Sequence, residues 1–232
     1  MCGRYLLDVP GSTLAAMFAA ENHVGDLTAR YNAAPTDRLP IVLNRSGVRS
    51  LEMASWGLEI PYGKRQLLIN ARGETVAQKR TFSRAFRTDR CIVPASGFYE
   101  WVKEPDPTKS GATVRQPWCF RPTGELFAFA GLHYLVPDSE GEAHSVFVVL
   151  TVGANAAVEQ VHHRMPAILA DQEMVDRWMD VDADELELGS LLAAIPGATV
   201  DMITRARVSR DVNSIRNDRP DLAEPLAALP EN

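Results

Sequence analysis

Short apolar segments separated by turn residues run through most of this chain and constrain its fold more than any other feature. Each segment is rich in Val, Ile, Leu or aromatic residues and stops at Gly, Pro, Asn or Ser, as strands joined by turns do. The predicted strands cover residues 41–44, 48–56, 66–71, 90–102, 118–121, 126–135, 145–152 and 198–203. Ser46-Gly47 predicts a turn between the first two of these strands. Pro94 and Gly97 predict a bend, and Pro122-Thr123-Gly124 predicts a hairpin between its flanking strands.

Apolar residues at helical spacing occur only in a few short stretches. The predicted helices cover residues 12–20 behind Ser12 as N-cap, 81–88, 171–179, and 182–194 with Gly197 as a stop. The polar residues 103–116 predict a loop, and the tail from about residue 220 is predicted to be irregular. Because no linker or repeat interrupts the chain, we expect a single α+β domain over residues 1–232, mainly short strands in a barrel-like sheet with peripheral helices.

Charge is distributed unevenly. The net charge is −6, yet residues 1–103 carry +5 and residues 104–232 carry −11. The first part is therefore compatible with a local anion-binding surface, although random scatter beside an acidic helical surface would give the same totals. No 18-residue apolar run and no leader-like apolar segment occur, so we expect no membrane span. Three cysteines without a C-x-x-C pattern predict a reducing compartment, no disulfides and no zinc site.

Cys2 follows directly after Met1 in Met1-Cys2-Gly3-Arg4-Tyr5. If Met1 is removed, an α-amine and a thiol share one residue, and both are partly nucleophilic near neutral pH. The amine can condense with an aldehyde, after which the thiol closes a thiazolidine ring; alternatively the thiolate attacks a carbonyl. The alternative is that Cys2 merely follows the start codon and has no chemical role.

Glu100 lies in Gly97-Phe98-Tyr99-Glu100-Trp101, between aromatic residues. Poor solvation should raise the pKa of its carboxyl toward the neutral range, where it could exchange protons. A strand with one outward Glu is the alternative. Asn70 and Arg72 end another strand and could hold a sugar or carbonyl oxygen and a phosphate, or simply form a polar loop.

The segment His162-His163-Arg164 offers one histidine as a proton donor and an arginine as a structural or anion-binding partner. Neighbouring residues of a strand point to opposite faces, so the two histidines are predicted to be a poor metal pair. Aromatic residues near Trp56 and Tyr62 alternate with Arg72 and other arginines, a combination that suits single-stranded nucleic acid, although core packing is the alternative for Trp56.

Taken in order, these motifs resemble the SOS response-associated peptidase family over residues 2 to about 213. The matching segments are Cys2-Gly3-Arg4-Tyr5, Tyr31-Asn32-x-Ala34-Pro35, Trp56-Gly57, Asn70-Ala71-Arg72-x-Glu74-Thr75, Arg90-Cys91-x-Val93-Pro94-Ala95-x-Gly97-Phe98-Tyr99-Glu100-Trp101, Phe127 to Leu132, His162-x-Arg164-Met165-Pro166 and Val212-Asn213. The resemblance implies an α+β barrel-like fold and a groove for single-stranded DNA that carries abasic sites. It implies no cofactor and no metal.

The resemblance also implies residue roles. Cys2 would be the nucleophile that forms a thiazolidine crosslink with the abasic aldehyde. Asn70 would position the Cys2 backbone or the deoxyribose, and Glu100 and His162 would transfer protons. DNA contacts are implied for Arg4, Arg72, Arg80 and Thr151, with Trp56 and Tyr62 as aromatic contacts. We expect a cytoplasmic monomer that associates with the nucleoid when bound to DNA, and that retains a cysteine (auto)peptidase activity against itself.

Two other functions remain open. An N-terminal-nucleophile amidohydrolase or peptidase would also begin Met-Cys-Gly, although the chain lacks an Asn-Gly-Asp/Glu oxyanion segment. A non-catalytic single-strand sensor would use the same groove without a covalent product. No nucleotide-binding glycine motif, zinc-protease motif or hydrolase nucleophile elbow occurs.

Overall fold

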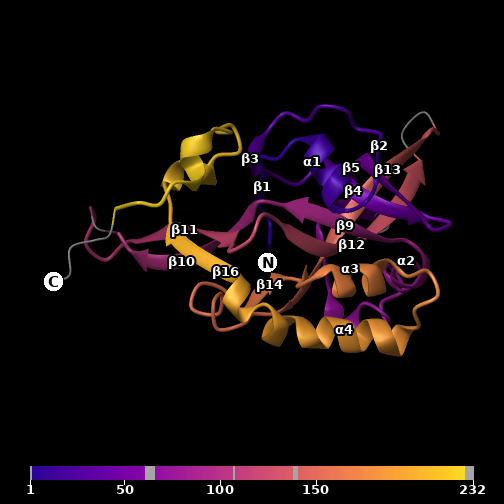
Figure 1. Cartoon of the computed structure of the whole chain (residues 1–232). Helices are drawn as coiled ribbons and strands as arrows, with labels where there is room; N and C mark the ends of the chain where they lie inside the picture. The colour runs from indigo at the N-terminus through magenta and orange to yellow at the C-terminus, as the bar shows by residue number, and fades with distance from the viewer. Residues whose placement is uncertain (1, 61–65, 107, 138–140, 228–232) are drawn as a thin grey trace.

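Two packed sheets form most of the structure, a computed structural model that describes residues 2–60, 66–106, 108–137 and 141–227 (Figure 1). The larger sheet has nine strands. They are β2 (Glu21–Asn22), β4 (Arg38–Arg45), β5 (Val48–Trp56), β8 (Asn70–Arg72), β9 (Arg90–Ala95), β12 (Phe127–Pro137), β13 (Ala143–Gly153), β14 (Arg164–Pro166) and β15 (Ile168–Leu169).

Five of these strands close into a ring. The order β13-β12-β9-β4-β5 runs round the sheet, and β5 returns to β13 through the parallel pairs Val146↔Ser55 and Phe147↔Trp56. The single-domain α+β prediction with a barrel-like sheet is therefore confirmed. Closure removes the exposed edges that an open sheet of this size would have.

The second sheet has five strands in the order β16-β11-β10-β1-β3. They are β1 (Tyr5–Leu7), β3 (Arg30–Ala33), β10 (Gly97–Pro105), β11 (Thr113–Pro122) and β16 (Ile203–Arg207). Strands β6 (Leu58–Ile60) and β7 (Gln66–Leu68) form a separate pair. Tyr5 joins the two sheets, because its ring lies 5.2 Å from Trp56 and 6.3 Å from Phe129 of the barrel.

Helices occupy the periphery (Figure 1). The α-helices are α1 (Gly11–Met17), α2 (Ser83–Thr88), α3 (Gln172–Met179) and α4 (Glu185–Ala198), and the 3₁₀ turns are η1 (Gly73–Thr75), η2 (Val200–Met202), η3 (Arg210–Asn213) and η4 (Pro220–Ala223). Asp171 caps α3 by accepting from the Met174 N–H at 2.8 Å. None of the helices in the described part of the chain has the length and hydropathy that a membrane span requires.

Several local predictions are confirmed. Strands β4 and β5 turn at Ser46 and Gly47, whose φ angles of 54° and 85° suit a tight hairpin. The chain bends between β9 and β10, where a Cβ on Gly97 would lie 2.7 Å from the Phe120 carbonyl oxygen. Only glycine permits this close approach.

Other local predictions are wrong. Ser12 is not the N-cap, because α1 begins at Gly11 after Pro10. The predicted strand 66–71 is divided, since β7 and β8 belong to different sheets. Helix α4 continues through Gly197, and the late strand starts only at Ile203. The buried Thr199 side chain donates to the Ile195 carbonyl oxygen at 2.8 Å and holds this helix end.

Long-range pairing overrides two further predictions. Residues 103–116 do not form one loop, because β10 and β11 extend into them and pair from Phe98↔Phe120 to Pro105↔Thr113. The hairpin expected around 122–124 is also wrong. Strand β11 pairs with β10 and β16, whereas β12 pairs with β9, β13 and β15, so the turn carries the chain from one sheet to the other.

Candidate active site

Cys2 lies just before β1 and is fully buried. This burial is that of the chain with Met1 still attached. The side-chain amide of Asn70, on β8, donates from Nδ2 to the Cys2 carbonyl oxygen at 2.8 Å. Asn70 Oδ1 is buried and has no hydrogen-bond partner among the described residues. Asn70 thus fixes the Cys2 backbone and leaves one acceptor available beside it.

Glu100 comes from β10, which is covered on both faces at this point. Only 3% of its surface is exposed, so the alternative of an outward-facing Glu is excluded. Burial raises the pKa of the Glu100 carboxyl, against the opposing influence of a backbone hydrogen bond and of His163. Burial also raises the pKa of the Cys2 thiol, and the Glu100 charge raises it further, which places the two groups within electrostatic reach.

His162 approaches Glu100 from the segment before β14. Its Nδ1 lies 3.9 Å from Glu100 Oε1 and accepts from the Arg164 backbone N–H at 3.0 Å. Burial lowers the pKa of His162, which favours the neutral ring at neutral pH. The His163 ring stacks on it at 4.5 Å between centroids. The expectation of opposite faces is wrong, because these residues precede the strand rather than form it.

Arg164 ties the two halves of the site together. Its guanidinium donates to both carboxylate oxygens of Glu74, at 2.5 and 2.9 Å, and to the Thr151 carbonyl oxygen at 2.6 Å. The hydrogen bond from Arg164 lowers the pKa of Glu74. Since Glu74 follows the Asn70 strand and Arg164 follows His162, this bidentate pair holds both elements in place.

Arg4 links the N-terminal segment to the late Val212-Asn213 motif. Its Nη1 donates to Asn32 Oδ1 at 2.7 Å and to the Val212 carbonyl oxygen at 2.9 Å. The buried Asn32 amide in turn donates to the carbonyl oxygens of Val212, Ser214 and Asn217. Three motifs that lie far apart in the sequence therefore meet in one hydrogen-bonded cluster.

An open groove of about 410 Å³ runs past these groups. Its walls are Gly3, Arg4, Glu100, Trp101, Arg115, His162 and Asn213. Sequence reasoning missed Trp101, Arg115 and Asn213 as groove residues. Trp101 and Asn213 stood in quoted motifs, and their contact from Trp101 Nε1 to Asn213 Oδ1 at 2.5 Å depends on tertiary folding. The sequence gave no indication that Arg115 lines the groove, because its segment was predicted to be a loop.

The predicted DNA contacts fall into four groups. Arg4 lines the groove, and its contact with DNA stays a prediction. Trp56 and Thr151 are fully buried in the free chain, and their DNA contacts stay predictions. The Trp56 indole donates to the Ile69 carbonyl oxygen at 2.9 Å within the core. Arg72 and Arg80 are exposed and make no ion pair with any described residue, and their DNA contacts stay predictions. Tyr62 lies outside the described residues.

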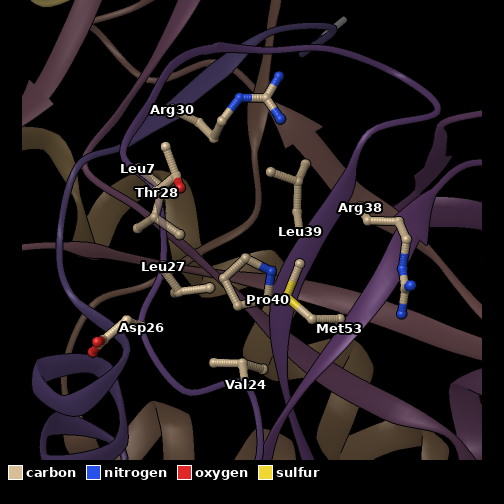
Figure 2. A pocket seen from close by; sticks show the side chains of 10 residues that line it. All are labelled: Leu7, Val24, Asp26, Leu27, Thr28, Arg30, Arg38, Leu39, Pro40 and Met53. Atoms are coloured by element: carbon tan, nitrogen blue, oxygen red, sulfur yellow. The ribbon is translucent and has the colours of Figure 1, made fainter.

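A second cavity, of about 280 Å³, lies at the other end of β1 (Figure 2). Leu7, Leu39 and Met53 form part of its apolar wall, and Arg30 and Arg38 stand at its edge (Figure 2). Arg30 is held by Asp37 and Asp218, each at 2.6 Å. None of the predicted site residues lines this cavity. Across the described chain, no group of three or more His, Cys, Asp or Glu side chains could hold a metal ion.

Known proteins resemble this chain along its whole length. A family model described as SOS response associated peptidase (SRAP) matches residues 1–215. Abasic site processing protein YoqW of Bacillus subtilis (strain 168) is 31% identical over 230 residues, covering 97% of this chain and 99% of the relative. Abasic site processing protein YedK of Escherichia coli (strain K12) is 27% identical, covering 97% and 100%.

A solved structure shares the fold. A protein from Bacteroides thetaiotaomicron superposes with a TM-score of 0.77 at 23% identity, covering 97% of this chain and all of the other. The match of the family model to most of the chain confirms the resemblance found in the motifs. By that match, this chain belongs to the SOS response associated peptidase (SRAP) family.

Proposed function

We propose that this chain processes abasic sites in single-stranded DNA by joining them covalently to Cys2 after Met1 is removed. The observation that carries the proposal is the meeting of Cys2, Asn70, Glu100 and His162, from four separate segments, beside one open groove. The names of two relatives, both abasic site processing proteins, support the substrate class.

The proposed reaction uses both nucleophiles of Cys2. The α-amine adds to the aldehyde carbon of the ring-opened abasic sugar, and the resulting carbinolamine loses water to form an imine. The Cys2 sulfur then adds to the imine carbon, and the thiol proton ends on the nitrogen. One C–N bond and one C–S bond form, one water leaves, and the product is a thiazolidine.

The neighbouring residues suit the proton transfers of this reaction. Glu100, with its raised pKa, retains a proton closer to neutral pH than an exposed Glu and can donate it to the departing hydroxyl. His162 is neutral at neutral pH and can accept a proton from the sugar or from water. Asn70 keeps Cys2 oriented toward both. Arg72 and Arg80 would hold phosphates at the exposed edge.

Intact-mass measurement tests the proposal. We expect a Met1-free chain, incubated with a single-stranded oligonucleotide that contains one abasic site, to gain the mass of the oligonucleotide less one water. The same oligonucleotide without the lesion is the control. Binding of both oligonucleotides without a covalent product would indicate a sensor instead. Release of ammonia from glutamine would indicate an amidohydrolase.

The phosphate role of Arg72 has its own test. Each phosphate contact on a single strand contributes about −0.7 to the slope of log affinity against log salt. We expect Arg72→Ala to make the slope shallower by about that amount and to weaken binding regardless of base sequence. Fluorescence anisotropy across a salt series measures both. Arg38→Ala, at the edge of the distant cavity (Figure 2), is the matched control; an equal change in both variants would contradict the assignment.

A further inference from the structure

Strands β10 and β11 form an arm that extends to the left of Figure 1, past the end of β1. Lys103 and Arg115 are direct partners in its antiparallel ladder. Directly opposed residues of such a ladder lie on the same face of the sheet, with Cβ atoms about 4.5–5.5 Å apart. Two positive side chains therefore stand next to each other on one face of this arm.

No acidic side chain in the described part of the chain is paired with either cation. Neither Lys103 nor Arg115 forms an ion pair or a side-chain hydrogen bond with any residue that the structure describes. The next acidic residue on the arm, Glu104, points to the opposite face and is paired with Arg207 at 2.5 Å. Like charges directly opposite each other destabilise a sheet. The arm thus keeps an unfavourable arrangement that a bound anion would relieve.

The pair also lies beside the groove. Arg115 forms part of the groove wall together with Trp101. Trp101 is two residues before Lys103 on β10, and residues two apart on a strand share a face. An aromatic ring followed by two cations on one face is the combination that holds a nucleotide of a single strand, by stacking on its base and neutralising its phosphates.

We propose that Lys103 and Arg115 form a backbone-phosphate subsite for the DNA strand on the arm side of the reactive centre. The inference rests on the proposed function, because it assumes that the groove holds DNA. Arg72 ends β8 and Arg80 lies in the segment after it, so these two arginines belong with the larger sheet, whereas β10 and β11 belong to the other. The strand would thus be held on both sides of Cys2, which leaves the abasic nucleotide between two anchored flanks.

The salt dependence of binding measures this subsite. The probe is an unmodified single-stranded oligonucleotide, and the protein carries Cys2→Ser so that only non-covalent binding is observed. Lys103→Ala/Arg115→Ala is expected to make the slope of log affinity against log salt shallower by about 1.4, two phosphates' worth. Arg38→Ala/Arg45→Ala removes the same charge from β4 and should leave the slope unchanged.

A second measurement separates function from folding. Because the two side chains repel each other, the melting temperature of the free double variant should equal or exceed that of the parent. With a second probe, a single-stranded oligonucleotide that contains one abasic site, shortening the strand on one side of the lesion should abolish the difference between parent and variant, which identifies the flank that the arm binds.

Each outcome decides between the proposals. An unchanged slope in Lys103→Ala/Arg115→Ala, or an equal change in the β4 variant, would overturn the phosphate subsite even if the covalent adduct forms. Loss of the adduct in the chain with Cys2 intact, with the slope difference preserved, would overturn the crosslinking chemistry and leave the subsite standing. A parent protein that does not bind single strands would overturn both.

Discussion

Replacement of Cys2 by Ser is expected to reduce the denaturant-stable adduct with abasic single-stranded DNA to the level of a protein-free control. Serine keeps the α-amine but lacks the thiol that closes the ring, so the imine remains open to hydrolysis. A hydride reductant should still trap that imine in Cys2→Ser. Denaturing gels with and without the reductant measure the two species.

The remaining cysteines provide the matched control. Cys119 is buried like Cys2 but has no α-amine beside its thiol. Cys119→Ala should therefore form the adduct as the parent chain does. Adduct formation by Cys2→Ala at the parent level would show that another nucleophile reacts, and the thiazolidine assignment would fail.

Glu100→Gln is expected to slow crosslinking by roughly 10²–10⁴-fold at saturating DNA, the range that a general acid–base group contributes. Glutamine keeps the shape of the side chain but cannot donate and recover a proton. DNA affinity should change little, because the buried carboxyl is not placed to hold a phosphate. Single-turnover kinetics resolve the rate from the affinity. Glu104→Gln, at a half-buried position further along the same strand, is the control.

The pH dependence of the same variant has a definite sign. Because burial raises the pKa of Glu100, the folded chain binds this proton more tightly than the unfolded chain does. The stability that this proton contributes is complete below the ordinary pKa of 4.5 and is lost as the pH rises toward the raised value. Glutamine cannot lose this proton, so Glu100→Gln should not lose stability as the pH rises. The melting temperature of the variant should therefore exceed that of the parent at alkaline pH. The parent crosslinking rate should fall over the same window. A Glu100→Gln rate within about twofold of the parent would make Glu100 structural.

The reactive groups could be predicted from short stretches of sequence, because their chemistry depends on residue type and on neighbouring residues. Aromatic residues around Glu100 predicted poor solvation, and the structure confirms both the burial and the direction of the pKa change. The Ser46-Gly47 turn and the Asp171 cap are likewise decided by neighbouring residues. The alternation of short apolar segments predicted many strands and a closed sheet.

The pairing between distant segments could not be predicted from the sequence. Residues 103–116 are mostly polar because one face of the arm is exposed, with Lys103 and Arg115 on it, and polarity by itself does not distinguish a loop from an exposed hairpin. The sequence shows an aromatic residue at position 56, but it does not show whether the Trp56 side chain faces the core or the solvent. Trp56 is in the core because β5 pairs with β13, which covers its indole.

The amino-acid sequence by itself determined the family, the strand-rich α+β class, and the residues that carry the proposed chemistry, because each is a property of residue type and short-range order. Tertiary structure alone decided that Thr151 is covered by Arg164, that Arg4 is bound to Asn32, and that Lys103 faces Arg115. The first two contacts join residues 13 and 28 positions apart in the sequence, and the third joins two different strands. Their geometry depends on how the strands of both sheets pair, and no local pattern encodes that pairing.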